Sequence, residues 1–294
     1  MKDTFQLITD MNSDLPLNFA KEHNIEIMLM GYNVDGTEYL TSEHPENLDP
    51  KEFYDRMRKG AVTKTVALET ELCRDTLKKF LDQDKDVLYI AFSSGLSSTC
   101  QNSMRVAEEL QQEYPHRKVR VVDSLSASLG QGLLVHYAAG LRDEGKGVDE
   151  VAKAVEGNRL KFCHYFTVDD LHFLHRGGRV SKTTAVVGSM LGIKPVLHVD
   201  DEGHLIAVGK VRGRKQALTA LVDHMEKKVG REENKIVFIS HGDCEEEAKF
   251  VADLVRKRFG IKSFLINYIG PSIGSHSGPG TVALFFVGEN RTEK

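Results

Sequence analysis

Short apolar runs alternate with longer amphipathic segments through the first half of the chain. Residues 87–92 form a continuous apolar run, which is typical of a strand buried on both faces of a sheet. A second short strand is predicted at 119–122, and helices are predicted from about 99 to 113 and from 126 to 144. Strands that alternate with helices of this length indicate right-handed β-α-β units and a mostly parallel sheet.

The pattern changes after residue 145, where the strands become more frequent. Asp200–Gly203 has the composition of a tight turn between two strands, so at least one strand pair is expected to be antiparallel. We therefore predict an α/β protein of two domains that pack closely around a cleft. Residues 1–157 would form an N-terminal domain with a mostly parallel sheet and helices on both faces, and residues 158–294 a C-terminal α+β domain with a mixed sheet. Further strands are predicted at 163–168, 195–199, 205–208, 236–240, 263–266 and 281–287.

Composition narrows the classes of function. The 294 residues carry a net charge of −4, which argues against a nucleic-acid partner because phosphate binding needs a basic excess. No apolar run approaches the roughly 18 residues of a membrane-spanning helix, and residues 1–6 lack the apolar core of a secretory signal. We expect a cytoplasmic protein that does not insert stably in a membrane, although transient membrane contact stays open.

A serine-rich segment follows the apolar run at 87–92 and precedes a predicted helix. Ser93, Ser94 and Gly95 stand where the free amide groups at a helix start favour an anion, and their hydroxyls add donors. The alternative is that these residues only cap the helix and shape a turn.

The segment 274–280 combines three glycines and a proline with His276. We predict a rigid loop that holds the imidazole between the hydroxyls of Ser275 and Ser277, and such a constrained loop histidine favours a functional role over a purely structural one.

Catalysis remains an alternative at this stage. Ser93 or Ser94 with His276 could serve a serine hydrolase or thioesterase, but neither serine stands in a GxSxG elbow. Phosphate-binding and dinucleotide fingerprints are also absent, and no metal site is expected. Residues 175–215 hold eight Lys or Arg and three acidic residues, which indicates either a solvated face or a docking surface for a partner.

Several motifs together resemble the DegV family of fatty-acid-binding proteins. They span nearly the whole chain in the order of that family: Ile8-Thr9-Asp10, Ser13-Asp14-Leu15-Pro16, Ser93-Ser94-Gly95-Leu96-Ser97, Asp123-Ser124, Ser126-Ala127-Ser128, Gly130-Gln131-Gly132, Arg176-Gly177-Gly178-Arg179, Gly192-Ile193-Lys194-Pro195 and Ile269 through Gly280.

The resemblance implies one long-chain fatty acid buried between the lobes and presented to a separate acyl kinase, with no cofactor and no catalysis by this chain. It implies that Thr65, His276 and one of Ser93 and Ser94 hold the carboxylate, with Gly95, Ser275 and Gly278 shaping the pocket. It also implies kinase docking through Arg176, Arg179 and Arg212. Burying about 15 methylenes contributes on the order of 10 kcal/mol, so the carboxylate needs only uncharged donors, and the basic residues are expected outside the pocket.

Overall fold

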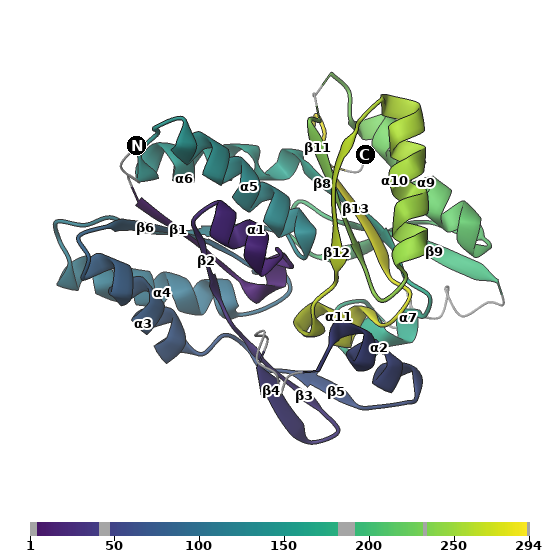
Figure 1. Ribbon diagram of the computed structural model, residues 1–294, viewed down its shortest axis with the longest axis horizontal. Helices are drawn as coiled ribbons and strands as arrows, with labels where there is room; N and C mark the ends of the chain where they lie inside the picture. The colour runs from purple at the N-terminus through teal and green to yellow at the C-terminus, as the bar shows by residue number, and fades with distance from the viewer. Residues whose placement is uncertain (1–4, 41–47, 182–191, 232–233, 293–294) are drawn as a thin grey trace.

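A computed structural model describes residues 5–40, 48–181, 192–231 and 234–292. The first half is built on a four-stranded parallel sheet in the order β2-β1-β6-β7 (Figure 1). All four strands are short and mostly apolar, as a sheet covered on both faces requires. Their bounds are β1 Phe5–Asp10, β2 Ile25–Met28, β6 Asp86–Ala91 and β7 Val119–Asp123.

Helices cover both faces of this sheet. Helices α3 and α4 pack on one face, where Leu77 and Leu110 meet Tyr89 of β6. Helices α5 and α6 pack on the other, where Leu133 and Val151 belong to a single large apolar cluster. The bounds are α1 Leu17–Glu22, α3 Thr70–Leu81, α4 Thr99–Glu113, α5 Leu129–Asp143 and α6 Val148–Asn158.

The second half is built on a six-stranded mixed sheet in the order β10-β9-β8-β13-β11-β12, in which only β11 and β12 are parallel neighbours. Helices α9 and α10 cover its outer face. Together the two sheets confirm the predicted α/β class with one parallel and one mixed sheet. The bounds are β8 Phe162–Thr167, β9 Ile193–Val199, β10 Leu205–Arg212, β11 Ile236–His241, β12 Ser263–Tyr268, β13 Val282–Val287, α9 Arg214–Lys228 and α10 Glu245–Phe259.

Helix α5 lies between the two sheets, with β1 on one side and β8, β11 and β13 on the other. Helix α5 has buried residues on nearly all of its sides, because it packs against an apolar sheet on each side. Leu7 of β1 and Phe285 of β13 belong to the same cluster as α5. The two halves thus share one core, and the division at residue 157, at the end of α6, stays a prediction.

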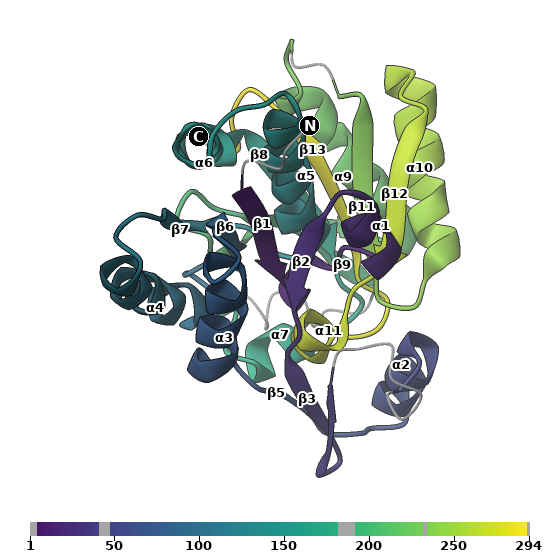
Figure 2. The ribbon, with the colours of Figure 1, turned by 60° about the vertical axis from the view of Figure 1, so that its left-hand side comes forward.

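A small antiparallel sheet, in the order β4-β3-β5, lies at the bottom of the view in Figure 2, below the two larger sheets. Strand β5 of this sheet and helix α2 both contact α11 of the second half. The Tyr54 hydroxyl of α2 donates a hydrogen bond to the Ile269 carbonyl at 2.8 Å. A turn at Asp35 and Gly36, both at positive φ, joins β3 to β4. The bounds are β3 Gly31–Val34, β4 Thr37–Leu40, β5 Thr63–Thr65, α2 Pro50–Arg58, α7 Leu171–Arg176 and α11 Pro271–Ser277.

The predicted loop at 274–280 is wrong in its first half. Residues 271–277 form helix α11, with Pro271 at the first helical position, where its fixed φ and missing N–H suit a helix start. Gly274 sits inside this helix because a Cβ there would lie 2.5 Å from the Tyr54 hydroxyl. The sequence at 184–193 is apolar on nearly all sides if helical, which favours a buried helix, but this stretch lies almost wholly outside the described residues. No helix of the described chain is long and apolar enough to cross a bilayer.

Candidate functional site

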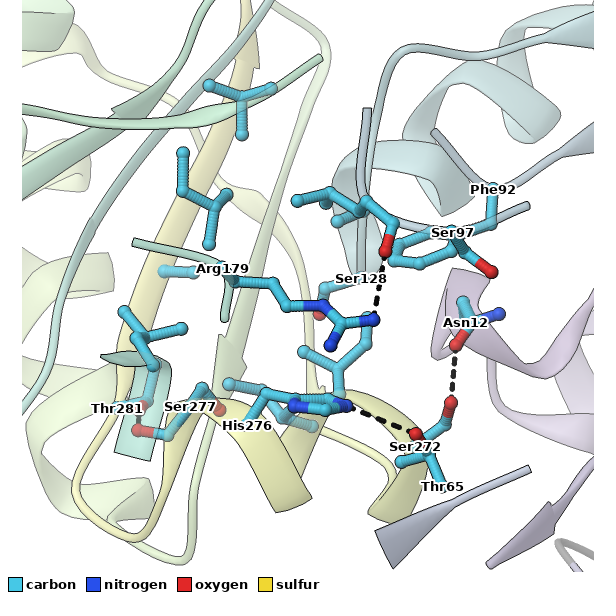
Figure 3. Close-up of a pocket in the computed structure, with 18 of the residues that line it drawn as sticks. Asn12, Thr65, Phe92, Ser97, Ser128, Arg179, Ser272, His276, Ser277 and Thr281 are labelled. Atoms are coloured by element: carbon cyan, nitrogen blue, oxygen red, sulfur yellow. Dashed lines mark hydrogen bonds between the residues drawn. The ribbon is translucent and has the colours of Figure 1, made fainter. Parts of the chain in front are cut away.

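A cavity of about 390 Å³ lies where the loops of the parallel sheet meet the inner face of the mixed sheet (Figure 3). That volume falls in the range of small-molecule sites. Most of its wall is apolar and comes from both halves of the chain. The apolar part includes Met30, Phe92, Leu96, Phe166, Leu174, Val199, Leu205, Ile269, Ala283 and Phe285.

One end of the cavity is polar. Thr65 ends β5, His276 stands near the end of α11, and the Thr65 Oγ1 and His276 Nε2 atoms share a hydrogen bond of 3.1 Å (Figure 3). Burial, together with the nearby Arg179 and Arg176 charges, lowers the pKa of His276 to about 4. The imidazole is therefore neutral at neutral pH, with one nitrogen able to donate and the other to accept.

The position of His276 depends on a close backbone approach. A Cβ added to Gly177, directly after α7, would lie 2.2 Å from His276 Nδ1. Gly278 is also constrained, since its φ is +78° and a Cβ would meet the Phe173 ring at 2.5 Å. Glycines therefore let α7 and α11 lie against each other and fix the imidazole in the cavity wall.

Arg179 also lines the polar end, although we expected it on the outer basic surface. Its guanidinium donates to the carbonyls of Gly177 and Leu96, the latter at 3.1 Å, and so bridges the two halves of the chain. Burial lowers the pKa of Arg179 below its usual range. The prediction that only uncharged donors line this end is therefore wrong. Arg176 and Arg212 are exposed, as a docking role would require.

Ser93, Ser94 and Gly95 do not line the cavity. Ser93 is fully buried and its hydroxyl donates to the Gly203 carbonyl at 2.9 Å, while the Ser94 amide donates to Asp123. A Cβ on Gly95 would meet the backbone of the 200–203 turn at 2.8 Å. The segment thus interlocks with the turn between β9 and β10, and its contact with a carboxylate stays a prediction.

Sequence reasoning missed the next residues of the same loop, which do line the cavity: Leu96, Ser97 and Ser98. It also missed Asn12 and Ser272, whose side chains meet at 2.6 Å across the two halves. The expected pocket residue Ser275 instead donates to the Pro271 carbonyl within α11. Sequence position alone could not decide which hydroxyl of a serine-rich loop faces inward.

Two buried carboxyl groups stand next to the cavity. Asp10 ends β1 and accepts hydrogen bonds from Tyr89, Asn12 and the Phe92 amide, while burial raises its pKa. Asp14 accepts from the Ser128 hydroxyl and from the Gly270 amide at 2.9 Å.

Asp14 takes part in a hydrogen-bonded chain between the halves. Ser128 Oγ also lies 2.7 Å from Ser240 Oγ of β11, so Asp14, Ser128 and Ser240 form one connected network. Burial raises the pKa of Asp14 from 3.8 to about 7, and the nearby Asp10 acts in the same direction. The first turn after β1 is thus tied to both α5 and the mixed sheet.

Comparison with known proteins agrees with this fold. The family model described as "Uncharacterised protein, DegV family" matches residues 4–289. A DegV domain-containing protein of Clostridium perfringens is 42% identical over 287 residues, covering 98% of each chain, and one of Lactococcus lactis is 34% identical over 290 residues, covering 99% of this chain and 100% of the relative.

Two solved structures share the whole fold. A DegV lipid-binding protein of Thermotoga maritima superposes with a TM-score of 0.85 at 28% identity, covering 98% of this chain and 100% of that one. A fatty-acid-binding DegV family protein of Thermus thermophilus gives 0.84 at 29% identity, covering 97% and 99%. These matches confirm the family inferred from the sequence motifs: the chain belongs to the DegV family.

Proposed function

We propose that this protein binds one long-chain fatty acid in the cavity, with the carboxylate at the polar end and the acyl chain along the apolar wall. The observation that carries the proposal is the cavity itself, which has a mostly apolar wall and a polar end where Thr65, His276 and Arg179 lie. The structural relatives from Thermus thermophilus and Thermotoga maritima are described as fatty-acid-binding and lipid-binding, which supports the same ligand class here.

The polar end suits a carboxylate. The Thr65 hydroxyl and the neutral His276 can each donate to an oxygen, and Arg179 supplies a positive charge at a half-buried position. The Arg179 guanidinium already donates hydrogen bonds to two backbone carbonyls, which leaves fewer N–H groups for a ligand. The carboxylate is therefore held by a few charge-assisted bonds, whereas the acyl chain contributes most of the affinity.

Mass spectrometry of organic extracts from the purified protein tests the proposal directly. We expect one fatty acid per chain, and the delipidated protein should bind a fluorescent fatty acid with saturation at one equivalent. Thr65→Val should weaken this binding about tenfold or more, because a hydrogen bond to a charged group is lost. Thr76→Val on the exposed side of α3 is the matched control. An empty protein that also fails to bind after delipidation would refute the proposal.

We further propose that the bound acid is presented to a separate acyl kinase. Arg176 and Arg212 are exposed, which supports a docking face formed by these two residues. Arg179 lines the cavity, so a substitution there would also affect fatty-acid binding. Arg212→Glu should leave fatty-acid loading unchanged and should abolish phosphorylation of the loaded acid by the kinase. Lys257→Glu, an equal charge change on the distant α10, should affect neither. Equal phosphorylation of all three proteins would exclude Arg212 from docking.

The hydrolase alternative finds no support in the hydrogen bonds of the site. Ser93 donates to Gly203, and the neighbour of His276 Nε2 is Thr65 rather than a serine. A fluorophosphonate probe tests it, because covalent labelling of Ser93 or Ser94 would revive the alternative.

A further inference from the structure

The wall of the cavity is arranged in layers, because alternate residues of two neighbouring strands face inward. Ala283 pairs with Phe166, and Phe285 pairs with His164, and all four residues line the cavity. Residues 282, 284 and 286 face the opposite core, beneath α9 and α10. Of these four paired residues, His164 is the polar one.

His164 lies deep in the cavity, far from the polar end. Thr281, which bonds to the carbonyls of Ser277 and Gly278 just after α11, marks the polar end on the same row. Phe285 comes four positions after Thr281 along the extended chain, which corresponds to roughly 13 Å. An extended acyl chain advances roughly 1.3 Å per carbon, so His164 stands beside about the tenth carbon of a bound fatty acid.

The imidazole of His164 has an unsatisfied hydrogen-bonding atom. The side chain is 1% exposed, and its Nε2 atom has no hydrogen-bond partner among the residues that the structure describes. Such an atom is costly in an apolar wall, because it has lost water without gaining a partner. A phenylalanine or leucine would fill this space without that cost, so the polar residue requires an explanation.

The surroundings keep the imidazole neutral and in place. Burial and the charge of nearby Arg291 hold the pKa of His164 well below its usual range. Gly130 of α5 makes room for the ring, since a Cβ there would lie 2.1 Å from Nε2. Phe285 packs edge-on against the ring, with centroids 5.3 Å apart. A neutral imidazole pairs with a group that can both donate and accept, as a hydroxyl does.

We propose that the cavity is selective for a fatty acid that carries a hydroxyl group near the middle of its chain, which hydrogen-bonds to His164. The proposal rests on fatty-acid binding and adds the substrate class to it.

Competitive binding to the delipidated protein tests the selectivity with three ligands of equal length. We expect 10-hydroxystearic acid to bind about tenfold more tightly than stearic acid, and 3-hydroxystearic acid to show no such gain. In His164→Phe, 10-hydroxystearic acid should lose about tenfold or more of its affinity relative to stearic acid, because its hydroxyl is then buried without a partner. Phe166→Leu, one layer nearer the polar end, should change both affinities alike.

The outcomes separate the selectivity from the proposed function. Tight binding of stearic acid with no preference for 10-hydroxystearic acid would overturn the selectivity and leave fatty-acid binding intact. Failure of all three acids to bind would overturn fatty-acid binding itself. If His164→Phe does not fold, nitrogen NMR of the wild-type imidazole replaces it: 10-hydroxystearic acid should shift the Nε2 resonance of His164 more than stearic acid does, and equal shifts would refute the contact.

Discussion

Replacing Asp14 with asparagine should remove a large pH dependence from the stability of the fold. Asparagine has the same shape and stays uncharged at every pH. Its Oδ1 atom can accept the Gly270 amide proton, and its Nδ2 group can donate to Ser128 Oγ, which then donates to Ser240. The variant therefore keeps the connections between the halves and removes only the titration.

The magnitude follows from the raised pKa of Asp14. The carboxyl has a pKa of about 7 when folded and 3.8 when unfolded, so between these values the folded protein holds a proton that the unfolded chain has released. Raising the pH through this window therefore destabilises the fold, by about 1.4 kcal/mol per pH unit and about 4 kcal/mol in all. The stabilisation is complete below pH 4 and is lost above pH 7.

Urea unfolding of the delipidated protein at pH 4, 5, 6, 7 and 8 measures this effect without a contribution from bound ligand. The free energy of unfolding of Asp14→Asn, relative to wild type, should rise by about 4 kcal/mol between pH 4 and pH 8. Asp75→Asn, at an exposed position on α3, should follow wild type. A constant difference between wild type and Asp14→Asn would refute the reasoning and show that Asp14 titrates normally.

Three further outcomes are expected. Gly177→Ala should weaken fatty-acid binding about tenfold, since the new Cβ would displace His276, and the same ligand titration with circular dichroism as a check on folding measures it. Gly203→Ala should destabilise the protein by about 2–4 kcal/mol in urea, because φ is +82° and the Cβ would lie 2.1 Å from Ser93 Oγ. Fatty-acid affinity should show no titration of His276 between pH 5 and pH 8, because its pKa is about 4; a step near pH 6.5 that His276→Gln removes would contradict this.

The sheet architecture was accessible from the sequence because its signals are local. The apolar run at 87–92 is typical of a buried strand and overlaps β6, and the Asp200–Gly203 turn predicts the antiparallel pair of β9 and β10. Helix α11 was missed because a glycine-rich segment is typical of a loop. Gly274 is required inside this helix because the Tyr54 side chain of α2 lies too close to leave room for a Cβ. Pro271 was the one local signal of a helix start.

The site was only partly accessible for the same reason. Thr65 and His276, which the family resemblance assigns to the carboxylate, both line the cavity, and their role there stays a prediction. The inward direction of Arg179 depends on a bond to Leu96, some 83 residues away in sequence. The layered position of His164 depends on the pairing of β8 with β13, which a pattern of single strands does not contain. Side-chain direction in this protein is decided by contacts between halves.

The strand order of the mixed sheet has a consequence for biosynthesis. Strand β13 comes after every other strand in the sequence, yet it occupies the middle of the sheet, between β8 and β11. Until residues 282–287 leave the ribosome, the two groups of strands already synthesised have open edges facing each other, which other chains could pair with. A chain that stops before β13 would leave the edges of β8 and β11 open.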